Sequence, residues 1–185
     1  ISFYYGGIPL DSFQEIGDCM DHLWAPWRKA YVIDGAREPG CVFCTKANEE
    51  TDADNFILHR GKTCYVIMNI YPYNNGHVMV VPYSHMSEYD ELQDETALEI
   101  TQLVRHYIRV LKRAMSPQGF NTGMNIGSVA GAGIAAHLHM HIVPRWNGDS
   151  NFMPVIGQTK VISEALIQTF EKLMQAEAEI SQQAE

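Results

Sequence analysis

Hydrophobic and polar positions divide this chain into short strand-like runs and two helical segments. Apolar runs bounded by Gly, Pro, Asn or Asp predict β-strands over residues 56–59, 64–68, 76–81, 120–126 and 136–143. A helical period of apolar residues predicts a long helix over about 88–115, through Ile100, Leu103, Val104, Tyr107 and Leu111. A second helix is predicted over about 163–174, followed by a polar tail that frays.

The order of these elements predicts an α+β fold. Strands joined by short turns pair antiparallel, so we expect an antiparallel sheet of about five strands, with a long crossover helix and a C-terminal helix on one face. The 185 residues, 46% of them hydrophobic, fit one compact domain over 20–185. Residues 1–19 have no clear period and no initiating Met, so we expect a mobile extension or a tag remnant there.

Charge and hydropathy exclude two classes of partner. The net charge of −9 argues against a nucleic-acid surface, which needs clustered Lys and Arg. No apolar run reaches membrane-spanning length and no secretion signal is visible, so we expect a cytoplasmic protein without a membrane partner. A bound phosphate would need backbone amides and a few local cations, of which Arg28, Lys29 and Arg145 flank the motifs below.

The segment His137-Leu-His139-Met-His141 carries the strongest chemical pattern. A strand sends alternate side chains to one face, so the three imidazoles should form a row with Leu138 and Met140 opposite. Imidazole is a nucleophile, a general acid or base, and a metal ligand near neutral pH. The alternatives are a His-rich exposed face and a zinc hydrolase in which His137 and His139 are catalytic ligands.

Two further patterns lie near this segment or upstream of it. The loop over residues 127–133 is rich in glycine, and its amides could form an anion-binding nest, although a plain connection is the alternative. Cys41 and Cys44 have the spacing of half a zinc site, with two buried thiols as the alternative.

The alternating histidines, followed by two apolar residues, resemble the motif of the histidine triad (HIT) superfamily of nucleotide hydrolases and transferases. The resemblance extends over about 23–152, and Asn69 with Pro72 and Gly76-His77-Val78 resembles the family's ribose-binding strand and the strand after it. The segments Trp24–Arg28 and Pro144–Asp149 resemble its bacterial diadenosine tetraphosphate (Ap4A) phosphorylase branch.

The resemblance implies a HIT-like fold and a two-step nucleotidyl transfer without a catalytic cofactor. His139 would attack the α-phosphorus, His141 would protonate or hydrogen-bond the leaving phosphate, and His137 would support the site or bind a metal. Inorganic phosphate as the second acceptor makes a phosphorylase, which Trp146 and the Trp24–Arg28 segment favour, and water makes a hydrolase. Relatives form homodimers, so a homodimer is expected. The alternative from another class is a non-catalytic module that binds purine nucleotides.

The resemblance also implies two sets of binding residues. Nucleotide and phosphate contacts are expected from Asn69, Asn125, Ser128, Gly131 and Gly133, although a turn Asn bonded to its own backbone is the alternative for either amide. Relatives often place Gln, Ser or Thr shortly before the first His, whereas residues 133–136 offer no polar side chain here. A possible structural zinc is expected on the set Cys41, Cys44, His85 and His137.

Overall fold

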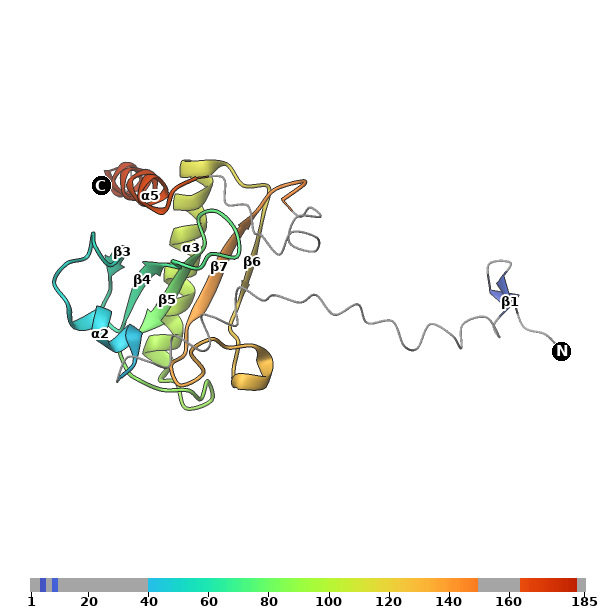
Figure 1. Cartoon of the computed structure of the whole chain (residues 1–185), viewed down its shortest axis with the longest axis horizontal. Helices are drawn as coiled ribbons and strands as arrows, with labels where there is room; N and C mark the ends of the chain where they lie inside the picture. The colour runs from blue at the N-terminus through green and yellow to red at the C-terminus, as the bar shows by residue number, and fades with distance from the viewer. Residues whose placement is uncertain (1–3, 6–7, 10–39, 150–163, 183–185) are drawn as a thin grey trace.

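A five-stranded antiparallel sheet organises the protein. The computed structural model describes residues 4–5, 8–9, 40–149 and 164–182. The strand order is β3-β4-β5-β7-β6 and every pair is antiparallel. The strands are β3 (Ile57–Arg60), β4 (Cys64–Met68), β5 (Val78–Pro82), β6 (Gly119–Gly123) and β7 (Met140–Arg145). The predicted α+β class and the predicted five strands are therefore confirmed (Figure 1).

Two long helices cover one face of this sheet. The crossover helix α3 (Asp94–Met115) connects the central strand β5 to the edge strand β6, and α5 (Leu166–Gln182) packs against α3. Alternate strand residues such as Val66, Val80 and Ile142 point toward these helices and form the larger core with Tyr107 and Leu173. The short helix α2 (Val42–Asn48) lies on the other face.

That other face has a smaller core. Ile57, Tyr65, Ile67, Met79 and Val81 pack there against Phe43 of α2. In the register of the sheet, Met79 on β5 lies opposite His141 on β7, so His141 points to this same face. His141 consequently lies on the side of the sheet opposite α3.

Several predicted boundaries were wrong, and proline explains the most important one. Strand β7 begins at Met140 rather than residue 136, because its partner β5 ends at Pro82, which has no amide hydrogen for the ladder. The Leu138 amide instead donates to the Met86 carbonyl, at 2.8 Å. Pro82 and Pro144 directly follow the predicted strands 76–81 and 136–143, but each belongs to its strand in the structure. Pro144 pairs with Phe120 of β6, beyond the last β5–β7 pair.

The helix boundaries differ for other reasons. Helix α3 begins at Asp94 rather than near 88, and its first turn is acidic, which suits the positive end of the helix dipole. Helix α2 was not predicted, because Phe43 is its only buried residue and seven residues give little periodicity. The predicted strand 120–126 ends at Gly123.

Helix α5 extends to Gln182, well beyond the predicted end at residue 174. Ala176 is buried in the main core and Ile180 packs against that core, so the segment expected to fray has an apolar face. Glu177 adds a polar anchor: it accepts a 2.7 Å hydrogen bond from the Tyr107 hydroxyl and lies 3.4 Å from His59 Nδ1. His106 Nε2 lies 3.5 Å from the same carboxylate.

This anchor makes a prediction about acid stability. Burial opposes ionisation of Glu177, but hydrogen bonds from His106, His59 and Tyr107 outweigh it and lower its pKa to about 2. Because the folded pKa lies below the unfolded value of 4.5, the stabilisation is present above pH 4.5 and is lost as the pH falls toward 2. It amounts to about 3 kcal/mol.

We therefore expect Glu177→Gln to lower the unfolding free energy in urea at pH 7 by up to about 3 kcal/mol. The difference from the wild type should shrink steadily below pH 4.5. Glu179, also on α5, pairs with Arg113 of α3 at the exposed surface, so Glu179→Gln should leave the unfolding free energy almost unchanged. A constant deficit for Glu177→Gln across this pH range would contradict the assignment.

The predicted extension over 1–19 lies outside the described residues, apart from a short antiparallel pair of strands, β1 (Tyr4–Tyr5) and β2 (Ile8–Pro9). The segment Trp24–Arg28 and Lys29 also lie outside them. Among the helices that the structure describes, none has the length and apolar character needed to cross a membrane.

Candidate active site

The three alternating histidines converge where the chain enters β7. His137 lies at a bend and His139 directly before the strand, and His141 is the second residue of β7. Their exposed fractions are only 1%, 6% and 7%. The rings of His139 and His141 lie 4.7 Å apart, and the Phe43 ring contacts both His137 and His139. The predicted shared face is therefore present, although only His141 belongs to the strand.

His139 is oriented by the backbone of His137. Its Nδ1 lies 2.9 Å from the carbonyl oxygen of His137, and because a carbonyl only accepts, Nδ1 carries the hydrogen. In the neutral ring this leaves the lone pair on Nε2. Burial lowers the pKa of His139 more than this hydrogen bond raises it, which favours the neutral form. Neutral His139 therefore has the tautomer that a nucleophilic Nε2 requires.

His141 is oriented by a fourth histidine that the sequence analysis did not assign to the site. The Tyr73 amide donates to His77 Nδ1 at 3.0 Å, so His77 carries its hydrogen on Nε2. That Nε2 lies 2.9 Å from His141 Nδ1 and donates to it. The proton of neutral His141 is consequently on its own Nε2. The pattern Gly76-His77-Val78 was noted, and a His directly before a buried strand was the available signal.

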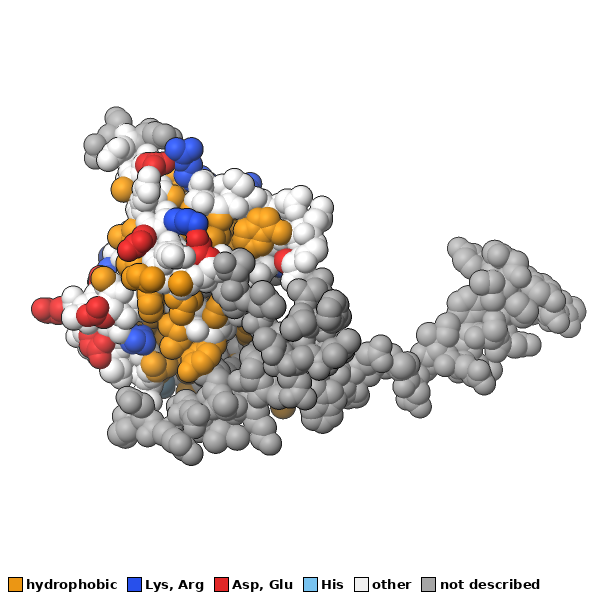
Figure 2. All heavy atoms as spheres, turned by 45° about the horizontal axis from the view of Figure 1, so that its top comes forward, with side chains coloured by type: hydrophobic (Ala, Val, Ile, Leu, Met, Phe, Trp, Pro, Cys, Tyr) orange, Lys and Arg blue, Asp and Glu red, His pale blue; other side chains and the backbone are white. Residues whose placement is uncertain are grey.

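An apolar groove of about 450 Å³ lies on the same face of the sheet. Phe43, Ile67, Met79 and Ile134 supply its apolar wall, and Asn69 lies among its lining residues. Among the residues that line the groove, Tyr71 is 54% exposed. Figure 2 shows hydrophobic side chains gathered on one face of the molecule. Because Phe43 contacts the His139 ring, the groove begins next to the candidate nucleophile.

Asn69, the predicted ribose contact, forms hydrogen bonds within the protein. Its Oδ1 accepts a hydrogen bond from the Tyr71 amide at 2.9 Å, and its Nδ2 lies 3.4 Å from His77 Nδ1. The local turn role considered in the sequence analysis is therefore present. The residue nevertheless lines the groove, so the structure places it between the groove and the histidines.

The glycine-rich loop leads from β6 into the histidines. Gly123, the last residue of β6, pairs with His141, and the loop continues through a short 3-10 turn at Ser128–Ala130. Gly127 and Gly131 have φ values of 79° and 85°, a left-handed conformation that a side chain would strain. Asn125, Ser128 and Gly133 also lie on this loop, so the predicted phosphate contacts share one segment.

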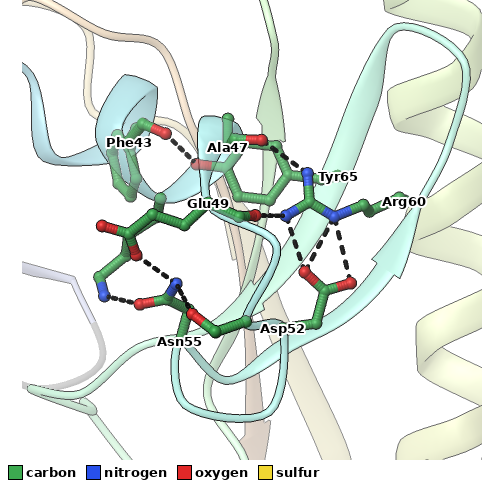
Figure 3. A network of polar contacts seen from close by, with 9 residues as sticks. Phe43, Ala47, Glu49, Asp52, Asn55, Arg60 and Tyr65 are labelled. Atoms are coloured by element: carbon green, nitrogen blue, oxygen red, sulfur yellow. Dashed lines mark hydrogen bonds and ion pairs between the residues drawn. The ribbon is translucent and has the colours of Figure 1, made fainter.

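A network of polar contacts holds α2 against the sheet (Figure 3). Arg60 of β3 donates to the carbonyl oxygens of Ala47 and Glu49, at 2.6 and 2.7 Å, where the end of α2 leaves carbonyls unpaired. The same guanidinium binds both carboxylate oxygens of Asp52. The Tyr65 hydroxyl donates to the Phe43 carbonyl at 2.9 Å. These bonds fix the helix that carries Phe43.

The predicted metal ligands also come together. One ligand atom from each of Cys41, Cys44, His85 and His137 lies within 4.8 Å of the others. His137 Nδ1 is 3.2 Å from Cys41 Sγ, and His85 Nδ1 is 3.4 Å from Cys44 Sγ. His137 Nε2 lies 2.9 Å from the Pro82 carbonyl and donates to it, which leaves Nδ1 for a metal. Two thiolates and two imidazoles match the tetrahedral donor set of structural zinc.

Arg145, one of the three cations expected near a phosphate, binds side chains of the protein. The Arg145 guanidinium donates to both carboxylate oxygens of Asp149 and to the Asn121 side chain. His139 is not part of the metal-capable group found among the described residues, and its Nδ1 faces a carbonyl. This geometry gives no support to a zinc hydrolase that uses His139 as a ligand.

Comparisons with known proteins agree with this fold and with the sequence motif. The chain is 40% identical over 159 residues to a protein named AP-4-A phosphorylase from Mycobacterium tuberculosis, with 82% of each chain covered. A histidine triad nucleotide-binding protein from Sulfolobus tokodaii superposes with a TM-score of 0.61 at 28% identity, over 77% of this chain and 93% of that one.

A zinc-bound histidine triad family protein from Mycobacterium smegmatis has the same fold, with a TM-score of 0.64 at 23% identity over 78% of this chain and 97% of that one. The model of the HIT domain family matches residues 50–148, which include the five-stranded sheet, α3 and the three histidines. The chain belongs to the HIT domain family.

Proposed function

We propose that this protein catalyses phosphorolysis of dinucleoside polyphosphates such as Ap4A through a covalent nucleotidyl group on His139. The observation that carries the proposal is the hydrogen bond from His139 Nδ1 to the His137 carbonyl. In the neutral ring this bond leaves the lone pair on Nε2, the atom that would attack phosphorus. The relative from M. tuberculosis, named AP-4-A phosphorylase, supports the choice of substrate class.

The first step forms one bond and breaks one. The lone pair of His139 Nε2 forms a P–N bond to the α-phosphorus, and the P–O bond to the departing polyphosphate breaks. The Nε2–H of His141, which the hydrogen bond from His77 holds in place, donates a hydrogen bond to the leaving oxygen and stabilises the negative charge that develops on it. For Ap4A the products of this step are ATP and an adenylylated histidine.

The second step reverses the roles. An oxygen of inorganic phosphate attacks the same phosphorus, the P–N bond breaks with its electron pair returning to His139 Nε2, and the His141 Nε2–H donates a hydrogen bond to the reacting phosphate oxygen. The products are ADP and the original imidazole. Splitting one difficult displacement into two easier ones is the general advantage of a covalent intermediate.

The binding residues follow from the two surfaces beside the histidines. The groove would take the nucleoside, with Asn69 at the ribose. The loop that contains Asn125, Ser128, Gly131 and Gly133 would contact the phosphates. Because the chain has a net charge of −9, neutral amide and hydroxyl donors are a better means of holding an anion here than the overall field.

A zinc ion on Cys41, Cys44, His85 and His137 would be structural. All four coordination positions come from side chains, which leaves none for a substrate or a water. Such an ion would join α2 to the segment that carries the nucleophile. The homodimer remains a proposal as well: β6 is an edge strand of the described sheet, and edge pairing with a second copy would satisfy its backbone groups.

The test is a product analysis with Ap4A labelled in its α-phosphates, in the presence and absence of inorganic phosphate. We expect ADP and ATP only when phosphate is present, together with acid-labile label on the protein. AMP and ATP formed regardless of phosphate would replace the phosphorylase by a hydrolase. Binding of intact Ap4A without turnover would leave the non-catalytic nucleotide-binding module instead.

A further inference from the structure

The chain after β7 makes a tight turn that the proposed chemistry does not use. Gly148 in this turn has φ of 77°, and the turn returns the Asp149 side chain to the end of the strand. The Trp146 amide donates to Asp149 Oδ2 at 3.0 Å. Arg145 donates through Nε to Oδ2 at 2.6 Å and through a terminal nitrogen to Oδ1 at 2.8 Å.

Asp149 also binds a distant part of the chain. The side-chain nitrogen of Asn74 donates to Asp149 Oδ2 at 2.8 Å and to the Pro144 carbonyl at 3.1 Å. The Asp149 side chain is only 10% exposed, and hydrogen bonds to a carboxylate are stronger than neutral ones. The carboxylate therefore fastens the loop over residues 69–77 to the end of β7.

This loop contains the groups that orient His141. The Asn74 carbonyl accepts from the His77 amide at 3.2 Å, and the neighbouring Tyr73 amide donates to His77 Nδ1. The Tyr73 ring lies 4.6 Å from the His77 ring and 5.3 Å from the His141 ring. A shift of Asn74 would therefore move both the amide that sets the tautomer and the ring that packs on the two imidazoles.

We propose that Asp149 is a positioning residue for His141, acting through Asn74 and the Tyr73 amide to keep the His141 proton on Nε2. The link to catalysis rests on the proposed function, in which this Nε2–H donates a hydrogen bond to the leaving group. The link to the tautomer rests only on the contacts above. In this proposal the motif Arg145-Trp-Asn-Gly-Asp149 acts on the orientation of His141 through the Asp149 carboxylate.

The test compares Asp149→Asn, Asn74→Ala and the double variant with Glu179→Gln. The last removes another carboxylate paired with an arginine, but on α5 and away from the histidines. Nitrogen-15 NMR of the imidazoles in the nucleotide-free protein reports the tautomers of His77 and His141. Steady-state kinetics with Ap4A and phosphate then separates kcat from KM.

We expect mixed tautomers and a kcat lowered about 10-fold or more in both single variants, with KM changed less than about twofold. The double variant should lose no more than either single one, because both interrupt one connection. Glu179→Gln should match the wild type.

Wild-type tautomers in folded Asp149→Asn and Asn74→Ala would overturn the proposal, as would losses that add in the double variant. If Asp149→Asn does not fold, Asn74→Ala gives the same readouts. A wild-type protein that turns over no dinucleoside polyphosphate would refute the proposed function, whereas the NMR comparison would still decide the positioning role.

Discussion

His139→Asn is expected to lower kcat for Ap4A phosphorolysis by at least about 10⁴-fold, as removal of a covalent nucleophile does in other enzymes. An asparagine amide can still donate to the His137 carbonyl in place of Nδ1, but it has no atom equivalent to Nε2. The fold and the groove should therefore survive while the P–N bond cannot form. Stopped assays with labelled Ap4A measure the rate, and acid-labile label on the protein should disappear.

His106→Asn is the matched control, because His106 lies on α3 on the other side of the sheet. It should retain the wild-type kcat at neutral pH. Retention of more than about one-tenth of the activity by folded His139→Asn would rule out a nucleophile at this position. The binding affinity for intact Ap4A should change little, because the groove and the glycine-rich loop are untouched.

Removal of the proposed zinc ion is expected to have the largest effect on stability. An ion present at about 1,000 times its dissociation constant adds about 4 kcal/mol to folding. At about 2–4 °C per kcal/mol for a chain of this size, Cys44→Ser should lower Tm by about 8–16 °C. Metal analysis of the purified protein should find one zinc ion per wild-type chain, and calorimetry gives Tm with and without chelator.

Cys64→Ala is the control for the loss of a thiol, since Cys64 is buried in the main core and away from the other two described cysteines. It should be destabilised by packing loss yet keep the full zinc content. A wild-type protein free of zinc after growth in zinc-rich medium, with Tm unaffected by chelator, would show that the four side chains do not hold this ion.

The spacing of apolar residues predicted the sheet and the two long helices, because an element that buries one face needs apolar side chains at a regular interval. The alternating histidines predicted the candidate site for the same reason, and the structure brings these histidines and the predicted metal ligands together. The limits of β7 were missed because they depend on Pro82 in another strand. The extent of α5 was missed because the polar residue Glu177 is paired with Tyr107, 70 positions earlier.

Hydrogen bonds between polar side chains far apart in the sequence could not be predicted from residue patterns. His77 and His141 are 64 positions apart, and Asn74 and Asp149 are 75 apart. Neither pair has a spacing that distinguishes it from unrelated residues, since the sheet topology alone brings them together. Arg145 illustrates the reverse error: its charge pointed to a phosphate, whereas its guanidinium binds Asp149 and Asn121.

His137 contributes to two centres through different atoms. Its imidazole belongs to the cysteine cluster, and its carbonyl oxygen receives the Nδ1 hydrogen of His139. A substitution at position 137 exchanges the ring but retains the peptide oxygen. Such a substitution is therefore expected to remove one ligand of the proposed zinc ion while His139 keeps the hydrogen bond that sets its tautomer.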